Sequence, residues 1–175
     1  MRAFFLTLFL AIYFSAPAQV DAYQQEIINY LNINGTVQEY GIVYEELFVR
    51  LKERVASSET PESFWDKLKE GKEESIDELI FTLSFAYRKH FKQNEIAEMT
   101  EFYKSDAAQK LITKSSNLTE EDHKIIENYE NSDVANKVKT KQVELSKDIS
   151  IIVREWNTEL FAKNMGAISK AGYSK

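Results

Sequence analysis

Residues that interrupt helices are rare in this chain, and this scarcity limits its fold more than any other feature. After residue 19 the sequence contains one proline and five glycines. Apolar residues recur three or four positions apart over long stretches, whereas no stretch shows the sustained apolar–polar alternation of a half-buried strand. We therefore predict an all-α fold, a multi-helix bundle of about six to eight helices with one long C-terminal helix.

Start and stop signals place the helices along the chain. Thr60 can cap a helix whose first position is Pro61, and Gly71 can end it. Ser75 and Glu78 fit a capping box, in which each side chain satisfies one unpaired backbone N–H at a helix start. Thr119 can cap a further helix. The other expected helices cover about 23–33, 37–56, 75–90, 93–104 and 133–165.

The helix expected over 75–90 carries apolar residues on two faces. Leu79 and Leu83 belong to one face, and Phe81 and Phe85 belong to another. A helix that is apolar on two faces is usually surrounded by other elements. We therefore expect this helix at the centre of the domain.

The first 18 residues have the pattern of a secretory signal peptide. Arg2 is followed by the apolar run 3–14 and then by Ala16-Pro17-Ala18. A membrane anchor would need roughly 20 apolar residues. We expect cleavage after Ala18, a mature chain without a transmembrane segment, and a periplasmic or secreted location.

Composition limits what the remaining chain can be. The formal net charge of the full chain is −6, and an acidic protein gains nothing from the phosphate backbone of nucleic acids. The chain has no cysteine, so its stability must come from a packed core. We expect residues 19–165 to form a single helical domain and residues 166–175, which hold two glycines and little apolar area, to be a flexible tail.

One short motif occurs twice, 27 positions apart, as "FYKSDAAQKL" and "YENSDVANKV". In each copy an aromatic residue precedes a Ser-Asp pair, and Asp is favoured in the first turn of a helix. A Ser in this position can cap the next helix. The motif therefore predicts a corner between two helices, and direct binding by the motif is the alternative. The aligned residues are Phe102 and Tyr129, Ser105 and Ser132, and Lys110 and Lys137.

Together with "SETPESFWDKL" and "HFKQNEIAEMTEFYKSDAAQKL", the first copy resembles a bacterial family called domain of unknown function 2059. Asp106 and Ala108 stand where the family usually has Pro and Gly. The resemblance covers about residues 60–165 and implies an exported, helical protein that does not look catalytic and has no known substrate. The residues that match the family pattern are Phe91, Glu95, Ile96, Phe102, Tyr103, Ser105 and Lys110.

Catalytic and metal-binding patterns are not found in the sequence. His90 and His123 are the only histidines, and neither has a ligand spacing such as His-Glu-x-x-His. No Gly-rich phosphate loop, nucleophile elbow or Cys-His pair occurs. We predict capping and packing for His90, solvent exposure for His123, and neither an enzyme nor a cofactor-binding protein.

A binding role remains, and two partner classes are compatible with it. We expect a non-catalytic interaction module of the bacterial cell envelope that presents a surface or groove to a protein partner. The alternative is a carrier of a small apolar ligand, such as a lipid chain, held between helices. Trp65 lies on a short helix beside Pro61 and is the candidate groove residue, although a core position is the other reading.

Overall fold

The computed structural model describes residues 20–55 and 60–173, and over these residues the chain is all-α, with no strand. The predicted signal peptide, residues 1–18, lies outside the described residues. The helices are α1 (Ala22–Ile33), α2 (Thr36–Val55), α3 (Glu62–Lys69), α4 (Lys72–His90), α5 (Gln93–Lys104), α6 (Asp106–Ile112), α7 (Glu120–Glu130) and α8 (Asp133–Lys170).

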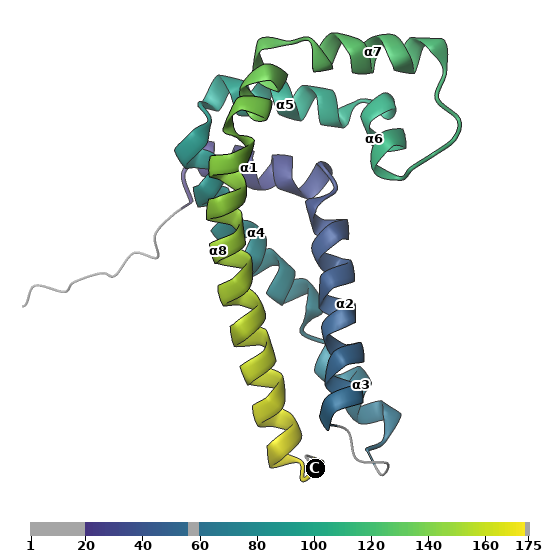
Figure 1. The fold of residues 1–175 in the computed structure, drawn as a ribbon, viewed down its shortest axis with the longest axis vertical. Helices are drawn as coiled ribbons and strands as arrows, with labels where there is room; N and C mark the ends of the chain where they lie inside the picture. Colours follow the sequence, from purple (N-terminus) through teal and green to yellow (C-terminus); the bar gives the residue numbers. More distant parts are fainter. Residues whose placement is uncertain (1–19, 56–59, 174–175) are drawn as a thin grey trace, which may run out of the picture.

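The long helix α8 runs along the long axis of the molecule, as predicted for the C-terminal segment (Figure 1). Helices α5, α6 and α7 gather at the end where α8 begins, and α3 lies toward its other end. Helix α4 packs against α1, α2 and α8, so the core forms around it. The largest fully buried side chains are Trp65, Tyr44, Phe48, Ile27, Leu31, Leu51, Leu79, Ile80, Leu83, Ile96, Met99 and Ile168.

Gly35 turns the chain from α1 into α2. Its φ of +95° lies in the left-handed region, which side chains with a Cβ rarely adopt. A Cβ at this position would also approach Cγ2 of Ile112 to 3.3 Å, so α6 packs close to the turn. The expected stop of the first helix near Gly35 therefore has a conformational and a packing cause.

The predicted capping box at Ser75 is wrong. Helix α4 begins one turn earlier, at Lys72, and Ser75 N–H donates within the helix to the Gly71 carbonyl. Ser75 is buried, and both its hydroxyl and its carbonyl accept from the Trp156 indole N–H, at 3.0 and 3.1 Å. The Ser75 hydroxyl therefore binds Trp156 of α8, whereas the sequence pattern predicted that it would cap a helix. Pro61 likewise precedes α3 as its N-cap residue and is not its first helical residue.

Helix α4 is central, but it is not surrounded. Leu79 and Leu83 are buried, whereas Phe81 and Phe85 are 41 and 52 % exposed. Neighbouring helices cover only part of its circumference, and the second apolar face that we expected to be buried faces the outside.

The segment predicted as a flexible tail is largely ordered. Helix α8 continues through Gly166 to Lys170, and Ile168 is completely buried. The Tyr173 ring lies 4.9 Å from the Phe64 ring of α3. Ile168 and Tyr173 therefore pack against the rest of the protein. The small residues around them made the segment look only weakly apolar in the sequence.

Candidate functional site

The two copies of the repeated motif form the same corner. The Ser105 hydroxyl accepts from the Ala108 N–H at 3.2 Å, and the Ser132 hydroxyl accepts from the Ala135 N–H at 3.2 Å, so each serine caps the helix that follows it. Each hydroxyl also donates to the carbonyl of the aromatic residue three positions earlier. The hydroxyl therefore satisfies one group of the ending helix and one of the starting helix.

The two copies also contact one another reciprocally. The Phe102 and Tyr129 rings stack with centroids 3.8 Å apart. Lys110 of the first copy pairs with Asp122, and Lys137 of the second pairs with Glu95. Asp122 and Glu95 are themselves 27 positions apart, and each occupies the third position of its helix. The helix that ends in each copy thus supplies the acid that the lysine of the other copy binds.

Both acids have a second partner at a helix start. The Glu95 carboxylate accepts from the Lys92 N–H at 2.7 Å, and the Asp122 carboxylate accepts from the Thr119 N–H and hydroxyl, each at 2.8 Å. Lys110 and these Thr119 donors lower the pKa of Asp122 to about 2. The pKa of Glu95 is also lowered, by Lys137 and by the Lys92 N–H, against the opposing effect of burial. Both carboxylates are therefore ionised at neutral pH.

The remaining family-motif residues lie among aromatic neighbours. Phe91 is buried and stacks on Tyr87, and the Lys137 ammonium lies 5.7 Å from the Phe91 ring centroid. The half-buried Tyr103 ring meets those of Tyr30 and Tyr129 edge to face. Phe91 and Tyr103 thus have partners inside the fold.

Trp65 does not line a groove. Its side chain is 2 % exposed, and its ring contacts the Phe64 ring edge to face. The prediction that Trp65 lines a groove is therefore wrong, and Trp65 is a core residue. The amphipathic spacing of a short helix cannot tell which large side chain its neighbours enclose.

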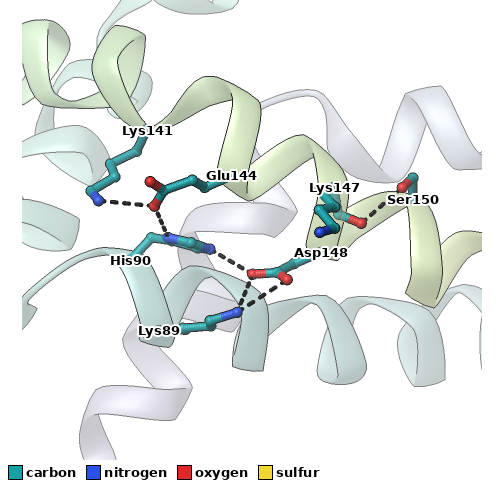
Figure 2. A network of polar contacts seen from close by, with 7 residues as sticks. All are labelled: Lys89, His90, Lys141, Glu144, Lys147, Asp148 and Ser150. Atoms are coloured by element: carbon teal, nitrogen blue, oxygen red, sulfur yellow. Dashed lines mark hydrogen bonds and ion pairs between the residues drawn. The ribbon is translucent and has the colours of Figure 1, made fainter.

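His90 joins the end of α4 to α8 in a polar network (Figure 2). Its Nε2 lies 2.6 Å from Asp148, and its Nδ1 lies 3.7 Å from Glu144. Asp148 also binds Lys89 at 2.8 Å, and Lys89 and His90 together lower the pKa of the Asp148 carboxyl. Both ring nitrogens face carboxylates of α8, an arrangement that holds two helices together. His123 is exposed on α7.

The described residues offer neither a metal cluster nor a membrane-spanning helix. No group of three or more His, Cys, Asp or Glu side chains in this part of the chain could hold a metal ion. None of the helices within 20–55 and 60–173 combines the length and the apolar character that a membrane crossing requires.

The exposed apolar face of α4 borders a groove against α8. We call this surface the α4–α8 patch and define it by Phe81, Phe85 and the residues that line the groove. The Phe81 and Phe85 rings meet edge to face at 5.3 Å. The groove has a volume of about 380 Å³ and is lined by Glu78, Leu79, Phe81, Thr82, Ile152, Glu155, Trp156 and Glu159.

A second groove separates α2 from α8. It has a volume of about 730 Å³ and a mostly apolar floor. We call it the α2–α8 groove, and the residues that line it are Val43, Leu47, Arg50, Arg54, Ser150, Val153, Arg154, Asn157, Thr158 and Phe161. Sequence reasoning found neither surface. The two phenylalanines were visible as a second apolar face, but α2 and α8 are about 100 residues apart, and nothing local shows that their arginines line one groove.

Comparison with known proteins supports the resemblance noted in the motif. Residues 77–130 match the model of a family described as "Uncharacterized protein conserved in bacteria (DUF2059)". The match is narrower than the region of about 60–165 that we expected, and it contains the first corner but ends just before Ser132 of the second. No curated protein and no solved structure matches the chain.

Proposed function

We propose that this protein, similar over residues 77–130 to an uncharacterised bacterial family, is an exported, non-catalytic binding module of the cell envelope. The observation that carries the proposal is the α4–α8 patch. Its partner is a protein segment with apolar side chains and basic residues.

The apolar part of the patch has the properties of an interface anchor. Phe81 and Phe85 come from the helix that organises the core, yet they remain 41 and 52 % exposed. Aromatic side chains with exposed faces beside a depression are typical centres of protein–protein interfaces, where a few such residues carry most of the binding free energy. Leu79, Ile152 and Trp156 extend the apolar surface into the groove.

The charge around the groove selects the partner. Glu78, Glu155 and Glu159 line it, and no lysine or arginine is among its described lining residues. A negative rim attracts a basic partner and raises its association rate, and it disfavours acidic competitors. An amphipathic segment with Lys or Arg beside its apolar face has the complementary pattern.

A catalytic role has less support. The most enclosed histidine, His90, faces Asp148 and Glu144 on α8. General acid–base catalysis needs a proton-transferring group that can reach a substrate. Here the neighbours of the imidazole come from the fold itself, which favours a structural role.

Affinity purification of the mature protein from its own periplasm or medium tests the proposed partner. The Phe81→Ser/Phe85→Ser variant should lose a specific protein that the wild type retains, and raised ionic strength should weaken its retention because surface charges are screened. Ile42→Ser/Val49→Ser is the matched control, since these residues are exposed apolar side chains of α2. Retention of the same proteins by all three forms would contradict the proposal.

Export has a separate test. Because residues 1–18 have the signal pattern, protein produced in a Gram-negative host should accumulate outside the cytoplasm with its N-terminus at or near Gln19. Mass analysis of the purified protein measures this. Full-length protein embedded in the membrane would be the contradicting result.

A further inference from the structure

The α2–α8 groove concentrates positive charge in an acidic protein. The chain carries 28 acidic and 22 basic residues, yet three of the groove's lining residues are arginines and none of its described lining residues is acidic. Arg50 and Arg54 belong to α2, and Arg154 belongs to the opposite wall, α8. The charge of this groove is therefore opposite to that of the α4–α8 patch, where glutamates line the groove.

These arginines are largely free to bind a ligand. Within the described residues, Arg54 and Arg154 make no ion pair. Arg50 pairs with Glu46 at 3.3 Å, but both side chains are about 60 % exposed, and such surface pairs contribute little. Three guanidinium groups that line one groove favour an anionic ligand there.

The spacing suits an anionic head group. Residues four apart on a helix lie on the same face about 5–6 Å apart, so the Arg50 and Arg54 side chains can converge on one group. A guanidinium binds a carboxylate through two parallel hydrogen bonds. The Asn157 amide adds a donor from the α8 wall, whereas the Ser150 and Thr158 hydroxyls donate to carbonyls of α8 itself.

The floor of the groove suits an aliphatic chain. Val43, Leu47, Val153 and Phe161 supply apolar side chains, and Phe161 is 38 % exposed. The volume of about 730 Å³ lies within the usual range of small-molecule sites, about 300–1,000 Å³. Such sites are typically apolar hollows with a few polar groups that orient the ligand.

We propose that the α2–α8 groove binds a single-chain fatty acid, with the chain on the apolar floor and the carboxylate held by Arg50, Arg54 and Arg154. This site is separate from the α4–α8 patch and does not depend on the proposed protein partner. The Phe81→Ser/Phe85→Ser variant should therefore bind the fatty acid as the wild type does.

Titration calorimetry with dodecanoate, below the concentration at which it forms micelles, tests the proposal. Dodecanoate should bind at one site per chain. Dodecyltrimethylammonium has the same chain with a cationic head, and acetate has the head without the chain. Neither of these probes should bind measurably, because each lacks one half of the recognised chemistry.

Matched variants locate the binding. Arg54→Gln/Arg154→Gln should weaken dodecanoate binding at least tenfold. Lys114→Gln/Lys124→Gln removes the same charge from exposed positions of the α6–α7 region and should leave binding unchanged. Phe161→Ser should also weaken binding, through loss of apolar contact. Circular dichroism melts of each variant show that the fold is kept.

Three outcomes would overturn the proposal. The first is no binding of dodecanoate to the wild type. The second is equal binding by the arginine and lysine variants, or equal binding of the cationic amphiphile, since the site would then recognise only a chain. The third is arginine-dependent binding of an acidic amphipathic peptide without binding of dodecanoate, which would make the groove a peptide site.

Discussion

At the scale of single residues, this protein uses short polar side chains for two bonds at once. Ser105 and Ser132 each accept from a helix start and donate to a helix end. Asp122 combines an ion pair with two bonds at the start of α7. Such residues fix the angle between helices, and this is why the aromatic residues of the two motif copies can stack.

Removing either serine hydroxyl should destabilise the protein. Ser105→Ala or Ser132→Ala should cost about 0.5–2 kcal/mol, as the loss of an N-cap usually does. Thr keeps both the acceptor and the donor, so Ser→Thr should cost least, whereas Asp keeps only the acceptor and should lie between. Denaturant unfolding measures these differences. Alanine variants as stable as the wild type would point to a functional role of the motif.

Asp122 should contribute to acid sensitivity. Its pKa is about 2 in the folded protein and about 3.9 in an unfolded chain, so its stabilising effect is complete above about pH 4 and disappears as the pH falls toward 2. Asp122→Asn should lower stability at pH 7 and reduce the loss of stability between pH 5 and pH 2.

Thermal melts at several pH values measure this effect. Asp66→Asn is the control, because Asp66 is exposed and makes no ion pair among the described residues. An unchanged pH profile in the Asp122 variant would show that the ionised Asp122 carboxylate, with its bonds to Lys110 and Thr119, does not contribute to folding.

At the scale of helices, local patterns predicted most elements but not their surroundings. Helix α5 and the start of α8 were predicted at their observed residues, because caps and apolar spacing are local signals. The burial of Trp65, the partner of Ser75 and the exposure of Phe81 depend on helices distant in sequence, so no local pattern could show them. Both candidate grooves are of this second kind, since each combines residues of two distant helices.

The end of α8 gives a direct test at this scale. Ile168 is completely buried, although it lies in the segment expected to be flexible. Ile168→Ala should cost about 2–5 kcal/mol, the usual range for deleting a buried aliphatic side chain. Ser169→Ala, at an exposed neighbouring position, should have almost no effect. If both variants unfold at the same denaturant concentration as the wild type, the segment does not pack in solution.

At the scale of the whole molecule, α8 connects two regions. Its first turns contact α5 and α7 and take part in the reciprocal contacts through Lys137, and its later turns pack on α4, while buried residues of both parts, from Val134 to Ile168, belong to one core cluster. Val143 lies between these parts and is 81 % exposed. At Val143 the helix is therefore held by its backbone hydrogen bonds, because the side chain makes little contact with the rest of the protein.

Val143→Pro should interrupt α8 between the two regions and lower the stability of the protein. Proline removes one helical hydrogen bond and clashes with the preceding turn, at a cost of about 3 kcal/mol or more. Val143→Ala removes the same exposed side chain and should change stability by less than about 0.5 kcal/mol. Thermal melts followed by circular dichroism compare the two. Equal melting temperatures would show that the helix is already interrupted near this residue.

The continuity of α8 also has a consequence for amide hydrogen exchange. Proteins open in partial units, and the amides of each unit exchange with the free energy of that opening. If the region of α5–α7 opens first, α8 loses its contacts from its N-terminal end while its later turns stay on α4. A single uninterrupted helix should then show two levels of protection, and the step between them should mark the border of two folding units at Val143.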